Sequence, residues 1–351
     1  MNKKSRIISA RGALLATVFS ALLTSRLSAG EDDTKGEKAI EALGGRVVRS
    51  PDAPGKPITS VHFGSTHVTD AGLKELAGLK GLQHLYLFGT KVTDVGLKEL
   101  AGLKSLEELY LGETKVTDVG LKELAGLKSL RFLELSETNV TDAGLKELAS
   151  LRGLQTLFIP FTKVTDAGLK ELAGLKGLEY LALVGTEVTD VGLKDLAGLQ
   201  SLQTLYLGTT KVTDRGLKEL AVLKGLQSLD IGETKVTDAG LKELAGLQSL
   251  KTLYLSDTNV TEAGLKELAG LKGLQVLILF KTKVTDAGLK ELANLQSLQT
   301  LNLGGTKVTD VGLKELAGLK SLGSLDVSDT RVTDAGVAEL QKALPKCNIE
   351  R

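Results

Sequence analysis

Residues 82–104, LQHLYLFGTKVTDVGLKELAGLK, form the stretch of sequence that determines the fold. With one further residue, this stretch recurs twelve times at a fixed period of 24 over residues 58–345. A Thr-Asp step follows the same period from Thr69 to Thr333, and Glu262 is the one substitution for the Asp. Because a unit of this length is too short to bury a core alone, the units must stack on one another.

Within one unit, the spacing of apolar residues predicts a short strand followed by a short helix. Leu85 and Leu87 have the two-residue period that sends both side chains to one face of a strand. The Thr-Asp step supplies hydroxyl and carboxylate acceptors suited to a helix N-terminus. Leu97 and Leu100 then lie three residues apart on the inner side of that helix. Each unit therefore contributes one strand and one helix.

Two other features of the unit bear on its packing. Asp94 and Lys98 are four residues apart on the outer side of the predicted helix, a spacing that contributes roughly a few tenths of a kcal/mol per pair. Gly96 and its equivalents are invariant across the units, which indicates close packing near the helix start.

The spacing LxxLxL, the threonine at position 90 and the continuation VTDxGLxxLAxL resemble the leucine-rich repeat family. They are similar to its ribonuclease-inhibitor-like and cysteine-containing subclass, found in F-box leucine-rich proteins and in exported bacterial proteins of the planctomycete type. The resemblance implies an α/β fold, a right-handed solenoid or horseshoe of twelve 24-residue strand-helix units with a parallel concave sheet. It also implies that Thr90 and its equivalents bond neighbouring backbone across the turn. The resemblance indicates almost nothing about activity, because this scaffold carries many different binding functions.

Residues 1–29 have the layout of a secretory signal peptide, with a basic start, an apolar run over residues 12–23 and small residues at Ser28 and Ala29. A mitochondrial-type transit peptide and an uncleaved anchor are the alternatives. Removal of the signal leaves 39 basic against 43 acidic side chains, a balance without global attraction for nucleic acid. The sequence thus predicts an exported protein, either periplasmic, in the cell envelope or secreted, with no membrane span after signal removal.

The two ends of the repeat array predict caps, because an open solenoid end would expose leucines to water. Residues 30–57 form the predicted N-terminal cap, with a helix over residues 34–43 and a strand over residues 46–49. Residues 58–345 form the twelve repeats. Residues 346–351 form a C-terminal capping strand, because Ile349 falls in register with Leu325.

The units differ mainly at three positions around the strand, numbered 84, 86 and 88 in the second unit, whose side chains point to the concave face. None of these 36 positions holds Lys or Arg, whereas Glu108, Glu134, Asp230 and Asp326 occupy four of them. Nine of the eleven aromatic residues left after signal removal also lie there, and Phe161 lies beside the same face. The predicted partner-binding residues are Tyr86, Phe88, Tyr110, Phe132, Phe158, Phe161, Tyr180, Tyr206, Tyr254 and Phe280.

Aromatic side chains on a rigid sheet are the anchors that protein interfaces use. We therefore expect a non-enzymatic module that binds a protein or peptide on an aromatic, mildly acidic concave face, with a hot spot at Phe132, Phe158, Phe161 and Tyr180. Alternatively, the tyrosines favour strands and only shield the sheet backbone, and the protein is a structural or adhesive component of the cell envelope. A third hypothesis, by analogy with the F-box proteins, is substrate recognition for a ubiquitin ligase.

The sequence contains none of the common catalytic or ligand-binding motifs: it has no phosphate-binding loop, paired-cysteine motif, HExxH or nucleophile elbow. We expect neither an enzyme nor a cofactor. The one cluster with ligand chemistry is His62, His84 and Glu108, a weak candidate for a zinc site near one end of the concave face. The identity of the partner and the oligomeric state do not follow from the sequence.

Overall fold

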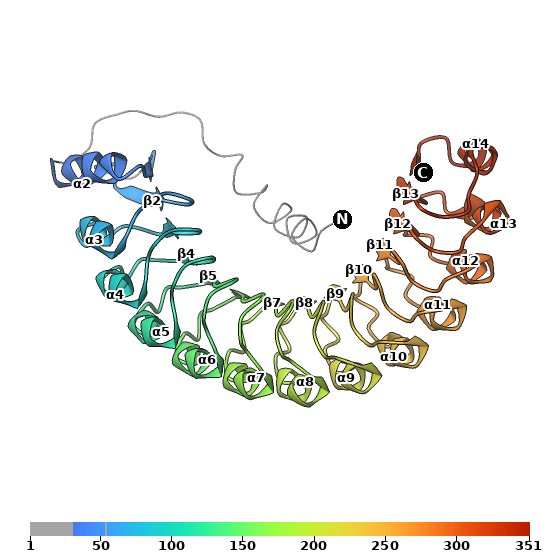
Figure 1. Ribbon diagram of the computed structural model, residues 1–351, viewed down its shortest axis with the longest axis horizontal. Coiled ribbons are helices and arrows are strands. Elements are labelled where there is room, and N and C mark those ends of the chain that lie inside the picture. The colour runs from blue at the N-terminus through green and yellow to red at the C-terminus, as the bar shows by residue number, and fades with distance from the viewer. Residues whose placement is uncertain (1–30, 53–54) are drawn as a thin grey trace.

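The structure is a computed structural model that describes residues 31–52 and 55–351, with side chains from residue 36 onward. The predicted signal peptide, residues 1–29, lies outside the described residues. The described chain curves into an arc in which strands line the inner edge and helices line the outer edge (Figure 1). The predicted horseshoe of strand-helix units is thereby confirmed.

All strands of the described chain belong to one sheet, in which they follow one another in chain order. They are β1 (Arg46–Arg49), β2 (Ile58–His62), β3 (His84–Tyr86), β4 (Glu108–Tyr110), β5 (Phe132–Glu134), β6 (Thr156–Phe158), β7 (Tyr180–Ala182), β8 (Thr204–Tyr206), β9 (Ser228–Asp230), β10 (Thr252–Tyr254), β11 (Val276–Ile278), β12 (Thr300–Asn302), β13 (Ser324–Asp326) and β14 (Asn348–Glu350). From β2 onward the pairing is parallel and offset by one repeat, so that Leu85 lies opposite Leu109. Equivalent positions of all units therefore form rows along the sheet.

The helices lie on the convex side, and most repeats carry one of seven residues. They are α2 (Glu31–Ala42), α3 (Asp70–Leu73), α4 (Asp94–Leu97), α5 (Asp118–Leu124), α6 (Asp142–Leu148), α7 (Asp166–Leu172), α8 (Asp190–Leu196), α9 (Asp214–Leu220), α10 (Asp238–Leu244), α11 (Glu262–Leu268), α12 (Asp286–Leu292), α13 (Asp310–Leu313) and α14 (Asp334–Ala343). In three repeats near the ends a four-residue helix continues as a 3-10 helix, namely η2 (Lys74–Leu76), η3 (Lys98–Leu100) and η4 (Lys314–Gly318). None of the described helices has the length and apolar character needed to cross a membrane.

Both predicted end elements are present. The N-terminal helix begins three residues earlier than expected, and β1 pairs antiparallel with β2, which covers the first strand of the repeats. At the other end β14 pairs in parallel with β13, and Ile349 lies opposite Leu325 as predicted. Arg351 donates from Nε to the carbonyl of Val332 at 2.7 Å and pairs with Asp334, which ties the last residue to the preceding turn.

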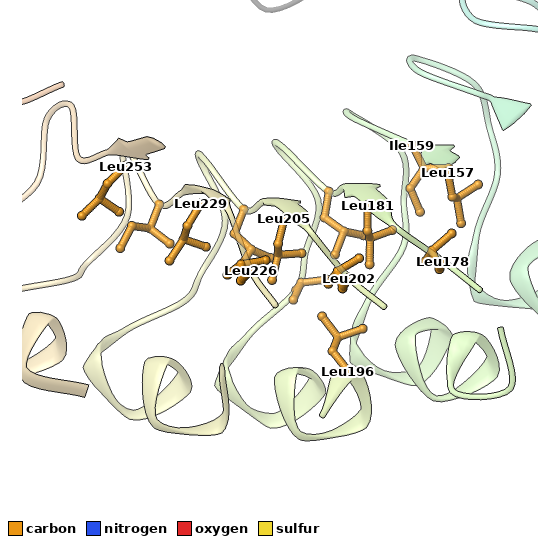
Figure 2. Close-up of a cluster of buried hydrophobic side chains, with 14 of the residues drawn as sticks. Leu157, Ile159, Leu178, Leu181, Leu196, Leu202, Leu205, Leu226, Leu229 and Leu253 are labelled. Atoms are coloured by element: carbon orange, nitrogen blue, oxygen red, sulfur yellow. The ribbon is translucent and has the colours of Figure 1, made fainter. Parts of the chain in front are cut away.

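The core is one continuous layer of leucines between the sheet and the helices. Leu181, Leu205 and Leu229 occupy the same position on successive strands and are fully buried (Figure 2). Leucines from the following turns and helices, such as Leu202 and Leu196, meet them from the convex side. Because apolar burial is the main favourable term in folding, this layer supplies most of the stability of the array.

Beside the core, the Thr-Asp steps form a hydrogen-bonded ladder between repeats. Oδ1 and Oδ2 of Asp94 accept from the backbone N and the Oγ1 of Thr117, at 2.7 and 2.6 Å. The expected pairing of Asp94 with Lys98 is wrong, because the next repeat already binds both carboxylate oxygens. The same two bonds recur at Asp70, Asp118, Asp142, Asp166, Asp190, Asp214, Asp238, Asp286 and Asp310.

The ladder explains the invariant glycine of the helix. A Cβ on Gly96 would lie 2.5 Å from Oδ1 of Asp70 in the preceding repeat, which confirms the close packing expected at this position. The ladder is interrupted once in the described chain, at Glu262, where neither bond to Thr285 forms and Thr285 does not cap its own helix. The longer glutamate side chain does not reproduce the geometry that aspartate provides.

Candidate partner-binding face

We call the surface made by residues 60, 62 and 64 and their equivalents at intervals of 24 the concave face. In each strand from β3 to β13, the middle residue is buried in the core and its two neighbours point away from the core. Because the strands pair in register, side chains at the same position of successive repeats stand side by side. The ten aromatic residues predicted to bind a partner fall into three groups on this face and its edge.

The first group is a continuous stack of rings near the N-terminal end, which we call the N-terminal stack. The rings of His62 and Tyr86 lie 4.1 Å apart and nearly parallel, and those of Tyr86 and Tyr110 lie 4.5 Å apart. Phe132 extends the stack, with its ring 4.5 Å from that of Tyr110. Tyr110 is 7% exposed, because its neighbours cover both sides of its ring. These residues bury much of their apolar surface against one another.

The polar groups beside the N-terminal stack are also satisfied within it. Nδ1 of His84 and the hydroxyl of Tyr110 each lie 3.2 Å from Oε2 of Glu108. The hydrogen bond between His84 and Glu108 raises the pKa of the histidine and lowers the pKa of the carboxyl. Burial raises the pKa of Tyr86 to about 12. Both shifts favour the charged forms of His84 and Glu108, so the pair is held together by opposite charges.

The three candidate zinc ligands do not gather into one set. His84 and Glu108 form a pair, whereas His62 stacks on Tyr86 in the neighbouring row of side chains. Burial, followed by the positive charges of His84 and Arg46, lowers the pKa of His62. Within residues 31–52 and 55–351, no group of three His, Cys, Asp or Glu residues is placed to hold a metal ion.

The second group, which we call the central run, consists of Phe158, Tyr180, Tyr206 and Tyr254. Its ring centroids are 6.3 Å apart between Phe158 and Tyr180, 5.4 Å between Tyr180 and Tyr206, and 6.1 Å between Tyr206 and Tyr254. The last two pairs meet edge to face, with interplanar angles of 69° and 81°. The three tyrosines are only partly buried. Phe158 is 6% exposed, much like Tyr110, so the central run differs from the N-terminal stack in its wider ring spacing and not in overall exposure.

The third group lies in the turns that follow the strands and comprises Phe88, Phe161 and Phe280. Phe161 adopts a positive φ of 55°, and its ring occupies the space where Gly185 lacks a side chain. The ring of Phe280 similarly approaches Gly304, and Nζ of Lys281 lies 5.3 Å from its centroid. The rings of Phe161 and Phe280 thus cover the glycine backbone of the next repeat.

This grouping divides the hot spot expected from the sequence. Phe132 belongs to the N-terminal stack, Phe158 and Tyr180 belong to the central run, and Phe161 lies on the turn. Phe132 lies opposite Thr156, whereas Phe158 lies opposite Glu134, so the two phenylalanines occupy different rows. The two residues lie on adjacent strands as expected, but at different positions of the repeat, and each ring packs against a different tyrosine.

Three of the four acidic residues of the concave face bond to the backbone at the strand ends. Glu134 accepts from the N–H of Gly112 at 2.7 Å and of Ser136 at 2.9 Å, one on each carboxylate oxygen. Oδ1 of Asp326 accepts from Ser328, and its Oδ2 accepts from the Asn302 side chain at 2.6 Å. Asp230 differs, because only its Oδ1 is bonded, to the N–H of Gly232 at 2.9 Å.

The setting of Asp230 changes its acidity. Its strand lies between those of Tyr206 and Tyr254, and all three residues are in register. Burial, with a smaller contribution from the negative charge of Glu233, raises the pKa of Asp230 to about 6, although the hydrogen bond from Gly232 opposes this shift. Burial removes water from the charged carboxylate of Asp230. A positively charged group beside it would therefore stabilise it more than the same group would stabilise a solvent-exposed carboxylate.

Sequence reasoning missed this difference between the acids, because all three occupy the same position of the repeat. Their hydrogen bonds depend on residues two positions onward and on the neighbouring repeats. It also missed the ladder, although the strict Asp, Thr and Gly columns, each recurring every 24 residues, were a signal that Asp of one repeat bonds Thr of the next beside a glycine.

Comparisons with known proteins concern this same stretch of chain. A family model described as a leucine-rich repeat region matches residues 145–329, and one described as a leucine rich repeat matches residues 80–140. The structure is similar to an internalin from Listeria monocytogenes, with 24% sequence identity and a TM-score of 0.63, covering 93% of this chain and 98% of that one. It is also similar to a repeat protein of Leptospira interrogans, with 24% identity, a TM-score of 0.53, and coverage of 79% and 80%. No curated protein matches the chain in sequence.

Proposed function

The chain belongs to the leucine-rich repeat family, and we propose that it is a non-enzymatic module that binds a protein or peptide partner on its concave face. The observation that carries the proposal is the distribution of side chains on that face. Nine of its positions hold aromatic residues and none holds Lys or Arg, whereas lysines recur in every helix from α3 to α13 and its 3-10 extension. Strand preference alone accounts for tyrosine but not for this exclusion of basic residues.

We place the centre of the binding surface at the central run. Tyr180, Tyr206 and Tyr254 are partly exposed and lie on a rigid sheet, so a partner would cover them at little cost in side-chain entropy. In the N-terminal stack the rings already pack face against face at 4.1–4.5 Å, so their faces are covered by one another. Partner binding at the turn aromatics is the weakest part of the proposal, since Phe161 and Phe280 cover glycines of the next repeat.

We further propose that the protein acts outside the cytoplasm, after removal of residues 1–29. The proposal draws on the basic start, apolar run and small residues of that segment. Its test is the N-terminal sequence of the protein recovered from its native cells, which we expect to begin near Gly30.

The experiment that tests binding is capture from envelope and culture extracts by the mature chain and by two variants. One variant carries Tyr180→Ala, Tyr206→Ala and Tyr254→Ala. The control carries Val95→Ala, Val119→Ala and Val191→Ala, which remove exposed apolar side chains from the convex helices. We expect a partner that wild type and control retain and the tyrosine variant loses, with all three folded by circular dichroism. Equal capture by all three proteins would contradict the proposal.

The second candidate function, a structural or adhesive component of the envelope, is favoured by one observation. Val95, Val119, Val191 and Val311 are at least 61% exposed and occupy the same position of their repeats, on the convex side. A contact between copies or with the envelope through these helices would be lost in the valine control and kept in the tyrosine variant. The same experiment therefore separates the two functions.

A further inference from the structure

We infer that Asp230, Tyr206 and Tyr254 form a binding site for a lysine or arginine side chain of the partner. This inference rests on the proposed function, because the cation belongs to the partner chain. It deepens that function by naming a chemical group that the concave face selects. The carboxylate would supply the charge, and the two rings would supply aromatic faces around it.

The first step is the unused oxygen of Asp230. In the described chain, Oδ2 accepts no hydrogen bond, whereas both carboxylate oxygens of Glu134 and of Asp326 are bonded. Every buried side-chain nitrogen and oxygen of the described residues has a hydrogen-bond partner. Oδ2 of Asp230 is therefore not fully buried, and it can accept a hydrogen bond from a ligand.

The second step is the aromatic surroundings. Tyr206 and Tyr254 lie two strands apart, yet their ring centroids are only 6.1 Å apart, so both rings lean toward the strand that carries Asp230. Their planes are inclined at 81°, so that they present two differently oriented faces near one carboxylate. Cations bind aromatic faces within about 6 Å of the ring centroid, and more strongly where water is excluded.

The third step is access on the side of the turn. A Cβ on Gly208 would lie 3.0 Å from Oδ2 of Asp230, and Gly232 follows on the next turn. The two glycines therefore leave the unbonded oxygen without a side chain over it. In other repeats the same space beside the turn is filled by an aromatic ring, because Phe161 lies against Gly185 and Phe280 lies against Gly304.

Charge favours the same occupant. The concave face has no Lys or Arg that could neutralise Asp230, its histidines lie at the N-terminal end, and the neighbouring Glu233 adds negative charge. Tyr206 and Tyr254 face Asp230 from the adjacent strands, and Tyr180 lies one strand further away. Burial raises the pKa of Tyr180 and of Tyr254, so neither phenol is charged at physiological pH. A charged hydrogen bond from an ammonium or guanidinium group would offset the loss of hydration that the carboxylate undergoes on burial.

The test uses the mature chain with ring-¹³C-labelled tyrosine, since five tyrosines give few signals to assign. The probe is the peptide GSGSKGSGS, compared with the same peptide carrying norleucine in place of lysine. We expect the lysine peptide to give saturable shifts at Tyr206 and Tyr254 and none at Tyr86 or Tyr110. Asp230→Asn should weaken this binding about tenfold or more, because the amide keeps the bond to Gly232 but loses the charge. The matched control Asp326→Asn should bind like wild type.

Two further readouts distinguish a site that binds a cation from a surface that binds apolar groups without selectivity. Tyr254→Leu, which keeps apolar area but removes the ring, should weaken the lysine peptide several-fold, whereas Tyr254→Phe should not. Affinity should also fall as the pH is lowered through about 6, where Asp230 becomes neutral in the free protein. Equal shifts with lysine and norleucine, or unchanged affinity in Asp230→Asn, would overturn the inference.

The failure of this site and the failure of the proposed function give different results. If the tyrosine variant loses its captured partner but the peptides do not discriminate, the concave face binds by apolar contact alone and only the cation site is wrong. If the lysine peptide binds as expected but capture does not depend on the tyrosines, the site stands and the partner surface lies elsewhere.

Discussion

The N-terminal stack and the central run are built from the same residue types at the same repeat positions. They differ in how closely their rings pack and in how many of their carboxylate oxygens are hydrogen-bonded. In the N-terminal stack the rings lie 4.1–4.5 Å apart, and Glu108 bonds His84 and Tyr110. In the central run the rings lie 5.4–6.3 Å apart, and Asp230 keeps an unbonded oxygen. The comparison teaches that aromatic content alone does not identify a binding surface. What matters is whether the rings and acceptors are already used within the protein.

The largest expected effect is on stability and distinguishes the two regions directly. Tyr110→Ala should lower the free energy of unfolding by about 2–3 kcal/mol, because it removes a nearly buried ring that contacts rings on both sides. Tyr206→Ala should lower it by only about 1 kcal/mol, since that ring is partly exposed and packs edge to face. Urea unfolding followed by circular dichroism measures both. Equal losses would remove the distinction between a structural stack and an open run.

A second prediction concerns the carboxylate of the central run. Burial raises the pKa of Asp230 above its value in the unfolded chain, so this residue stabilises the fold most at low pH and loses that contribution as the pH rises through about 6. Asp230→Asn should therefore be more stable than wild type at pH 8 by about 1 kcal/mol, after allowance for solvent screening. The difference should shrink toward pH 5 in thermal unfolding. A loss of stability at pH 8 would mean that Asp230 is held by contacts that neutral asparagine cannot replace.

A third prediction addresses the ladder, which supports both regions and is interrupted at Glu262. Glu262→Asp should restore the two bonds to Thr285 and stabilise the protein by about 1 kcal/mol, since glycine already stands at position 288 to admit the carboxylate. Glu267→Asp, in the same helix but outside the ladder, is the control and should leave stability unchanged. If both substitutions behave alike in urea unfolding, the ladder contributes little to the stacking of repeats.

The smallest expected effect lies at the ion pair beside the N-terminal stack. The raised pKa of His84 stabilises the fold below 6.5 and loses that effect as the pH rises, whereas the lowered pKa of Glu108 stabilises it above 4.5. The pair therefore acts mainly between pH 4.5 and 6.5. Glu108→Gln should be more destabilising at pH 5.5 than at pH 8.5 by roughly 0.5 kcal/mol in thermal unfolding. A pH-independent effect would show that Glu108 acts through Tyr110 instead.

The sequence allowed the fold to be predicted almost completely, because a strict period fixes which leucines meet once the units stack. The register of Ile349 with Leu325 and the packing at Gly96 both follow from position within the repeat, and the strand at residues 46–49 follows from the need to cap the first unit. The candidate site was predictable only as a set of residues on one face. Ring orientation and carboxylate bonding depend on contacts between neighbouring repeats, and these separate Phe132 from Phe158 and distinguish Asp230 from Asp326.

The central claim is that a partner covers the central run and leaves the N-terminal stack unchanged. Hydroxyl-radical footprinting of the free protein and of the captured complex, read by mass spectrometry, tests it at individual tyrosines. We expect Tyr180, Tyr206 and Tyr254 to become protected in the complex, with no change at Tyr86 and Tyr110. Protection of the N-terminal stack, or of the convex helices alone, with the three central tyrosines unaffected, would contradict the claim.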